Sequence, residues 1–105
     1  MRPYNCGIGP AFEAIGGKWK ALILYQLHEQ PVRTGELRRL LSGITEKMLI
    51  QQLREMEADG LVLRAAYPEV PPRVEYSLTQ LGAELNAALG PIADWGSKYA
   101  AARAR

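Results

Sequence analysis

Hydrophobic residues in the middle of the chain follow the spacing of two consecutive helices. Leu49, Leu53 and Met56 are separated by four and then three residues, so they share one face of a helix. A shorter helix just before it supplies an apolar partner surface with Leu37, Leu40 and Leu41. The arrangement predicts a helix-turn-helix over residues 34–59.

Both helices of this motif have a threonine where a helix is expected to begin. Thr34 and Thr45 are candidate N-caps, because a threonine hydroxyl can accept a hydrogen bond from a free backbone N–H. The face opposite the leucines carries side chains that suit base edges or phosphates, namely Lys47, Gln51, Gln52 and Arg54. On an isolated helix, the same face would equally well be an ordinary solvated surface.

Two extended segments follow the second helix. Residues 61–67 are rich in apolar side chains, and residues 73–78 alternate polar and apolar. Pro68, Pro71 and Pro72 lie between them and cannot continue a strand, because proline lacks the donor of the ladder. We therefore predict a wing over residues 61–78, with Arg64 and Arg73 beside its tip favouring phosphate contact. The alternative is a hairpin that only completes the core.

A long amphipathic segment over residues 79–100 begins at Thr79, a further candidate N-cap. Its apolar residues follow a heptad seam, namely Leu81, Leu85, Ala88, Ile92, Trp95 and Tyr99, with Leu89 beside them. Gly90 and Pro91 predict a kink, or a division into two helices, near residues 87–92. The small core leaves little surface to cover this stripe, so we expect a homodimer whose interface includes Leu85, Leu89, Ile92, Trp95 and Tyr99. Packing of the stripe back onto the first two helices is the alternative.

Two shorter helices precede the motif. Pro10 suits the first turn of a helix over residues 10–15, which Gly16 and Gly17 end. A second helix over residues 18–29, ended by Pro31, presents an apolar stripe of Trp19, Leu22, Ile23 and Leu27. Val32 and Arg33 can form a very short strand. The expected fold is α+β but mostly α: a single winged helix-turn-helix domain over residues 1–105, with dimerisation helices at 10–16 and 79–100.

Composition narrows the possible functions. The 105 residues are 48% hydrophobic, which suits one modest core, and 13 basic against 11 acidic residues give a net charge of +2. Attraction to DNA would then depend on how charge is distributed over the surface. No segment approaches the roughly 20 apolar residues of a membrane helix, so we expect a cytoplasmic protein without a membrane partner. One cysteine and one histidine cannot form a structural zinc site, and nothing supplies Cys6 with a catalytic base, so we expect no metal, no cofactor and no enzyme activity.

The chain resembles the HxlR-type transcriptional regulators, winged-helix proteins related to the MarR group. The resemblance is carried by residues 15–19 (Ile-Gly-Gly-Lys-Trp), 43–49, 52–54, 59–62, 67–79 and 95–96. It implies a homodimer whose terminal helices form the interface, and whose recognition helices enter successive major grooves of a pseudo-palindromic operator in double-stranded DNA. The candidate DNA-contacting residues are Thr34, Thr45, Lys47, Met48, Gln51, Gln52, Arg54, Arg64 and Arg73.

The resemblance also gives Cys6 a possible role. Family members commonly carry a cysteine near the N-terminus, and in some it senses small oxidants or electrophiles; Cys6 occupies this place, although Gly7 follows it where proline is frequent. A helix beginning just after a cysteine can raise its thiolate fraction. The alternatives are an unreactive packing residue, control by a small ligand held between the terminal helices, and a winged helix that binds protein or RNA.

Overall fold

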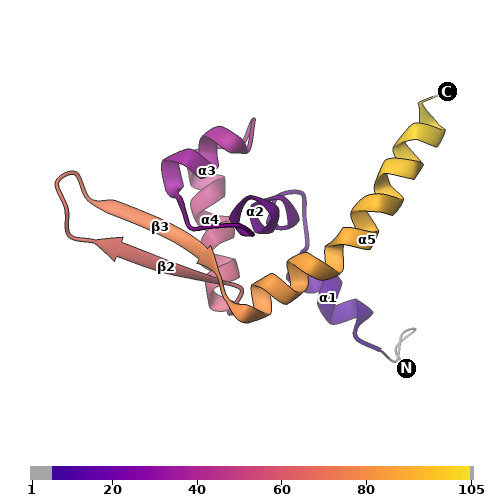
Figure 1. Cartoon of the computed structure of the whole chain (residues 1–105), viewed down its shortest axis with the longest axis horizontal. Coiled ribbons are helices and arrows are strands. Elements are labelled where there is room, and N and C mark those ends of the chain that lie inside the picture. Colours follow the sequence, from indigo (N-terminus) through magenta and orange to yellow (C-terminus); the bar gives the residue numbers. More distant parts are fainter. Residues whose placement is uncertain (1–5, 105) are drawn as a thin grey trace.

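The computed structural model describes residues 6–104, which form five helices and one three-stranded antiparallel sheet (Figure 1). The helices are α1 (Ile8–Ala14), α2 (Lys20–Leu27), α3 (Thr34–Leu40), α4 (Glu46–Ala58) and α5 (Gln80–Arg103). The strands are β1 (Val32–Arg33), β2 (Val62–Tyr67) and β3 (Arg73–Leu78), in the spatial order β1-β3-β2. This is the α+β, mostly α, winged helix-turn-helix that the sequence predicts. Within residues 6–104, no helix is long and apolar enough to cross a membrane.

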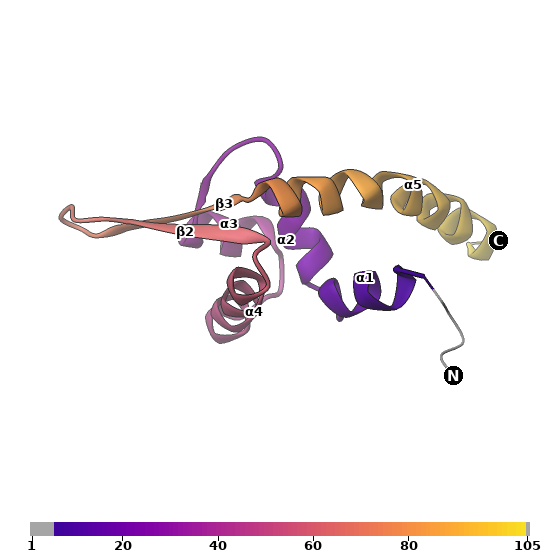
Figure 2. The same cartoon turned by 90° about the horizontal axis from the view of Figure 1, so that it is seen from below.

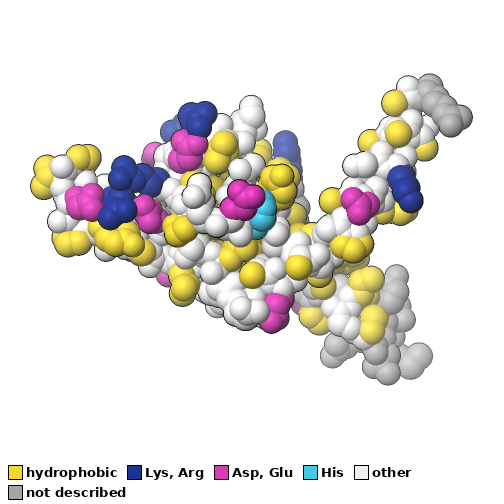
Figure 3. All heavy atoms as spheres, viewed as in Figure 1, with side chains coloured by type: hydrophobic (Ala, Val, Ile, Leu, Met, Phe, Trp, Pro, Cys, Tyr) yellow, Lys and Arg dark blue, Asp and Glu magenta, His cyan; other side chains and the backbone are white. Residues whose placement is uncertain are grey.

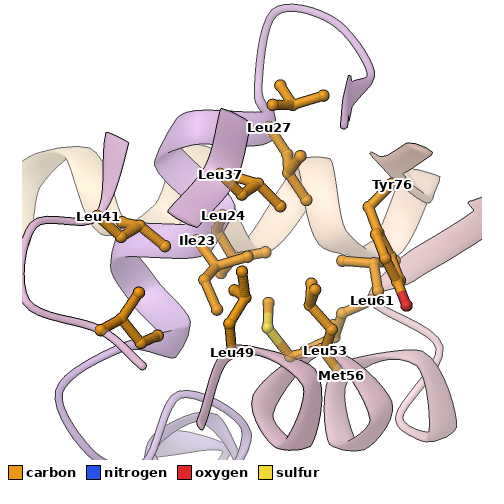
Figure 4. Close-up of a cluster of buried hydrophobic side chains, with 13 residues drawn as sticks. Ile23, Leu24, Leu27, Leu37, Leu41, Leu49, Leu53, Met56, Leu61 and Tyr76 are labelled. Carbon is orange, nitrogen blue, oxygen red and sulfur yellow. The ribbon is translucent and has the colours of Figure 1, made fainter. Parts of the chain in front are cut away.

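The core lies between α2, α3, α4 and the root of the sheet (Figure 4). The predicted inward face of α4 is confirmed, because Leu49, Leu53 and Met56 are fully buried. They meet Ile23, Leu24 and Leu27 from α2, Leu37 and Leu41 from α3 and its C-cap, and Leu61, Val62 and Tyr76 from the sheet and its entry. Burying one such side chain stabilises the fold by about 1.5–3 kcal/mol, so α4 is fixed mainly by this face.

Two predicted core positions are wrong. Leu22 is 44% exposed, and Leu24 is buried in its place. The reason is that α2 is apolar on nearly all sides, so its pattern did not select a face. Leu40 is 39% exposed, because α3 ends there and the next residue, Leu41, turns into the core instead.

The starts of the two motif helices differ in how they are capped. The hydroxyl of Thr45 accepts a hydrogen bond from the backbone N–H of Met48 at 3.1 Å, which confirms the predicted N-cap of α4. Thr34 is not an N-cap: it is the first residue of α3, and Arg33 precedes it with no side-chain hydrogen bond to the helix. The cause is β1, which leads directly into α3 and leaves no capping position for the threonine.

The hairpin of β2 and β3 extends away from the helices as a wing (Figures 1 and 2). Its antiparallel register places Tyr67 opposite Arg73 at the tip and Val62 opposite Leu78 at the root. On the other side of β3, Val32 of β1 pairs with Tyr76, which ties the wing to the segment before α3. The predicted short strand at residues 32–33 is therefore confirmed, and it makes β3 the central strand.

The start of α5 is joined to the turn that follows α4. The hydroxyl of Thr79 accepts a hydrogen bond from the N–H of Gly82 at 3.0 Å and donates one to the carbonyl of Gly60 at 2.6 Å. Gly82 is buried against Leu61, where an added Cβ would overlap the carbonyl oxygen and lie 3.1 Å from the carbonyl carbon. Only glycine allows the backbones to approach this closely.

Helix α5 is continuous through Pro91, so the predicted division into two helices is wrong. Pro91 has no N–H to donate to the carbonyl of Ala87, and the axis of α5 turns along its length in Figure 1, as the predicted kink requires. The second half of α5 leaves the body of the molecule on the side opposite the wing (Figures 1 and 2).

The N-terminal helices have slightly different bounds from those predicted. Helix α1 begins at Ile8, so Pro10 lies within its first turn, and α2 begins at Lys20. Lys20 is only 8% exposed, and its Nζ lies 2.7 Å from Oε1 of Glu55 on α4. This ion pair joins a buried lysine of the helix before the motif to a glutamate of α4 whose side chain is 45% exposed, and the sequence pattern did not indicate it.

Candidate nucleic-acid interface

Helix α4 presents an exposed polar face opposite its buried leucines. Thr45, Lys47, Gln51 and Arg54 are all exposed, and a shallow groove along this face is lined by Glu46, Lys47, Ile50, Gln51, Arg54 and Glu55. Within residues 6–104, neither Lys47 nor Arg54 forms an ion pair with a carboxylate. Both cations are therefore available to a phosphate or to a base edge.

The amide side chains of α4 are held only weakly. Gln51 donates from Nε2 to Oε2 of Glu55 at 3.4 Å, and Gln52 donates to the sulfur of Met48 at 3.6 Å. Lys20, and then Gln51, lower the pKa of Glu55 by hydrogen bonding to its carboxylate. Long bonds of this kind cost little to exchange, so both amides can turn toward a base.

Helix α3 contributes less free charge to this surface. Arg39 is paired with Glu36 on the same helix, and Nη1 of Arg38 lies 3.9 Å from Oε2 of Glu46 at the start of α4. Thr34 is half-buried at the first residue of α3. The side chains expected to contact DNA thus concentrate on α4, while the arginines of α3 are occupied by neighbouring carboxylates.

The two arginines predicted for the wing have different surroundings. Arg64 is exposed on β2, and it has no ion pair in the part of the chain that the structure describes. Arg73 lies between two carboxylates: Nη2 is 2.8 Å from Oε2 of Glu69, and Nη1 is 2.8 Å from Oε2 of Glu75. Its guanidinium also lies 3.8 Å above the ring of Tyr67. The hydrogen bonds to Glu69 raise the pKa of Arg73, so it stays charged.

The heptad seam of α5 divides into a covered and an exposed part. Leu85 and Leu89 pack against the core, whereas Ile92, Trp95 and Tyr99 are 51%, 63% and 47% exposed. Trp95 and Tyr99 stack on each other with ring centroids 5.1 Å apart. Apolar side chains are visible along the projecting end of the helix in Figure 3. The alternative in which Trp95 and Leu89 pack back on the first two helices is wrong for Trp95, whereas Leu89 does pack against the core.

Cys6 is exposed, and it lies two residues before the start of α1. Within the described chain, no group of three or more histidine, cysteine, aspartate or glutamate residues could hold a metal ion. A further groove of about 590 Å³ lies between α2 and α5. Leu22, Tyr25, Leu89 and Ile92 give it apolar walls, and His28, Asn86 and Asp94 give it polar edges.

The sequence profile of the HxlR-like helix-turn-helix family matches residues 14–104, which include the motif, the wing and α5. The chain belongs to this family. Members of the HxlR-like family are regulators rather than enzymes: a similar protein from Bacillus subtilis, the uncharacterised HTH-type transcriptional regulator YkvN, is 53% identical over 100 residues, covering 95% of this chain and 85% of YkvN. This HxlR-like protein is accordingly a helix-turn-helix transcriptional regulator.

Solved structures agree with this assignment. The chain is similar to a protein from Porphyromonas gingivalis assigned to the MarR family of transcriptional regulators, with a TM-score of 0.85 and 41% identity over 92% of this chain and 95% of that one. It is also similar to the redox regulator HypR in its reduced form, with a TM-score of 0.83 and 42% identity over 89% of this chain and 92% of HypR. The winged-helix architecture of this HxlR-like protein therefore matches known regulators over nearly its whole length.

Proposed function

We propose that this protein regulates transcription by binding a pseudo-palindromic operator as a homodimer. The observation that carries the proposal is the exposed face of α4, where Lys47 and Arg54 flank Gln51 and form no ion pair within residues 6–104. A helix fixed by a buried apolar face and carrying cations and an amide outward suits the major groove. The residues proposed to lie near bases or phosphates are Thr45, Lys47, Met48, Gln51, Gln52 and Arg54 on α4, Thr34 at the start of α3, and Arg64 on the wing.

The homodimer is supported by the exposed end of α5. Ile92, Trp95 and Tyr99 form an apolar stripe that residues 6–104 of the same chain leave exposed, and exposed apolar patches of this kind commonly mark interfaces. A two-fold axis through this stripe would pair it with the same residues of a second copy, as an isologous interface requires. Two recognition helices would then meet half-sites roughly 34–36 Å apart on one side of the duplex.

Binding to selected DNA tests the proposed interface. Duplexes would be enriched from a random-sequence pool with the full chain, and affinities would be measured by fluorescence anisotropy over a salt series. Lys47→Ala should weaken binding to all duplexes and reduce the slope of log K against log salt by about 0.9 for each lost phosphate contact. Gln51→Ala should instead reduce the preference for the selected sequence, by about 1–3 kcal/mol.

Lys18→Ala is the matched control, since Lys18 is an exposed cation just before α2, outside α4, the wing and the exposed stripe of α5. It should bind like the wild type. Equal affinity of the wild type for selected and scrambled duplexes would contradict sequence-specific recognition. In that case, competition between plain duplex DNA and protein or RNA partners would address the interaction-module alternative.

We also propose that oxidation of Cys6 controls DNA binding. The support is its exposure next to α1, together with the similarity to HypR, a redox regulator with known reduced and oxidised forms. Oxidation by diamide would join the Cys6 thiols of two protomers, which together give two protons and two electrons to the diamide as the S–S bond forms. The disulfide would then change the separation of the recognition helices through α1.

Anisotropy with reduced and diamide-treated protein tests this switch. Treatment should change operator affinity in the wild type, and Cys6→Ser should bind equally well before and after it. Retained sensitivity in Cys6→Ser would contradict the proposal. Equal binding of the wild type in both states would favour a small apolar ligand in the groove between α2 and α5, whose walls and polar edges suit an aromatic molecule.

A further inference from the structure

We infer that Arg73 is a positioning residue of the wing and not a contact to DNA. Its role is to hold the hairpin tip in one shape, so that the wing meets DNA through its apolar tip and through Arg64, which forms no ion pair within residues 6–104. This inference rests on the proposed DNA-binding function, and it concerns which wing residues serve that function.

The surroundings of Arg73 occupy three of its five N–H donors. Its Nε and Nη2 both donate to Oε2 of Glu69, at 3.1 and 2.8 Å, and its Nη1 donates to Glu75 at 2.8 Å. One face of the guanidinium is covered by the ring of Tyr67, and the side chain is only 25% exposed. Planar stacking combined with several hydrogen bonds is a geometry that arginine provides and lysine does not.

The charge of this cluster also opposes a phosphate contact. Glu69 and Glu75 outweigh the single positive charge of Arg73, so the three side chains together carry a net charge of −1. A phosphate that approached Arg73 would meet two carboxylates, and it would have to displace one of them to form a bidentate pair. A cation intended for DNA is better left unpaired, as Arg64 is within residues 6–104.

The position of the cluster explains what it can hold. Tyr67 and Arg73 are the last pair of the β2–β3 ladder, and Glu69 belongs to the connection beyond it. The ion pair with Glu69 therefore closes the loop that carries Val70, which is fully exposed between prolines. Apolar side chains and prolines are among the groups that proteins insert into the minor groove. Arg73 thus fixes the loop that would present Val70.

Three substitutions in the full chain separate positioning from phosphate contact, with the duplex selected by the wild type as probe. Glu69→Gln should weaken binding about two- to fivefold, because one surface ion pair is lost, and should leave the salt slope unchanged. Arg73→Lys should weaken binding by a similar factor although it keeps its charge. Arg64→Gln is the matched control on the same hairpin, and it should lower the salt slope by about 1 per protomer.

The opposite pattern would overturn the inference. If Arg73 contacted phosphate, Glu69→Gln would bind DNA more tightly, because the guanidinium released from Glu69 could pair with a phosphate; unchanged binding of Glu69→Gln also counts against positioning. Hydrogen exchange of the β2 and β3 amides gives a second readout, which should become faster in Glu69→Gln and Arg73→Lys but not in Arg64→Gln. Failure of the wild type to prefer its selected duplex would instead contradict the proposed function itself.

Discussion

Thr79 and Gly82 join the start of α5 to the turn after α4. Thr79 bridges the carbonyl of Gly60 and the first turn of α5, and its own N–H donates to the carbonyl of Leu61 at 3.1 Å. Gly82 lies directly against the same carbonyl. The atoms nearest to Gly82 belong to the backbone of Leu61, so no side-chain rearrangement can make room for a larger residue.

Gly82→Ala should therefore destabilise the protein by about 1–3 kcal/mol, the usual cost of overpacking. Chemical denaturation followed by circular dichroism measures the difference. Gly35→Ala is the matched control, because Gly35 lies in α3 with nothing within 4 Å of an added Cβ. It should gain about 0.5–1 kcal/mol from the better helix propensity of alanine. If Gly82→Ala were as stable as the wild type, the start of α5 could move away from Leu61 without a loss of folding free energy.

The ion pair of Lys20 and Glu55 predicts a specific acid dependence. Lys20 lowers the pKa of Glu55 in the folded state, so the pair contributes stability above the ordinary pKa of glutamate and loses it as the pH falls through the lowered value. Glu55→Gln should lower the denaturation midpoint at neutral pH, and it should flatten this acid dependence. Denaturation at a series of pH values tests the prediction, with exposed Glu57→Gln as the control. Parallel pH profiles of wild type and Glu55→Gln would contradict it.

The sequence predicted the faces of α4 but not the partners of Arg73. Leu49, Leu53 and Met56 define a narrow stripe, so the exposed residues opposite them follow from helical geometry alone. The environment of Arg73 depends instead on the hairpin register and on the loop that returns Glu69 to it, which no local period reveals. The acidic residues four before and two after Arg73 are the only sequence signal of the cluster.

At the scale of elements, the predicted helices and strands are all present. Strong stop signals bracket them, such as Gly16-Gly17 after α1, Pro31 after α2 and the prolines at the wing tip. The bounds of α1 and α2 differ by one or two residues from the prediction, because local sequence does not fix the residue at which a helix begins or ends. The choice of face on α2 failed for a related reason, since only the tertiary packing distinguishes Leu22 from Leu24.

The kink in α5 gives a prediction at this scale. Pro91 removes one helical hydrogen bond and costs up to about 3 kcal/mol in a helix interior, so Pro91→Ala should raise the free energy of unfolding. It should also straighten α5 and weaken binding to the duplex selected by the wild type. Denaturation and anisotropy on the same preparation measure both effects. If Pro91→Ala were more stable but bound DNA as the wild type does, the kink would not be needed for operator recognition.

The whole molecule extends in two directions from one small core. Its dimensions are 49 × 39 × 24 Å, with the wing on one side and the second half of α5 on the other. The core fixes α4 and the first half of α5, through Leu53 and Leu85 among others, but leaves Trp95 63% exposed. The monomer therefore has one surface suited to DNA and a separate one suited to a second copy.

Trp95→Glu should disrupt the proposed dimer while leaving the monomer folded. A buried tryptophan at an interface commonly contributes about 2–4 kcal/mol, so the dimer dissociation constant should rise accordingly. Sedimentation equilibrium measures it, and Leu63→Glu is the control, because Leu63 is an equally exposed apolar residue on the wing. A monomeric wild type, or an unaffected Trp95→Glu dimer, would place the interface elsewhere.

The joint at Thr79 and Gly82 has a consequence for operator length. Hydrogen bonds and a close backbone contact join the turn after α4 to the start of α5, so we expect this joint to resist changes in the angle between the two helices. Each base pair inserted at the operator centre shifts one half-site by about 3.4 Å and rotates it by about one tenth of a turn. A stiff joint between α4 and α5 cannot follow both this shift and this rotation. We therefore expect the regulator to bind operators of one spacer length and to reject operators one base pair longer or shorter.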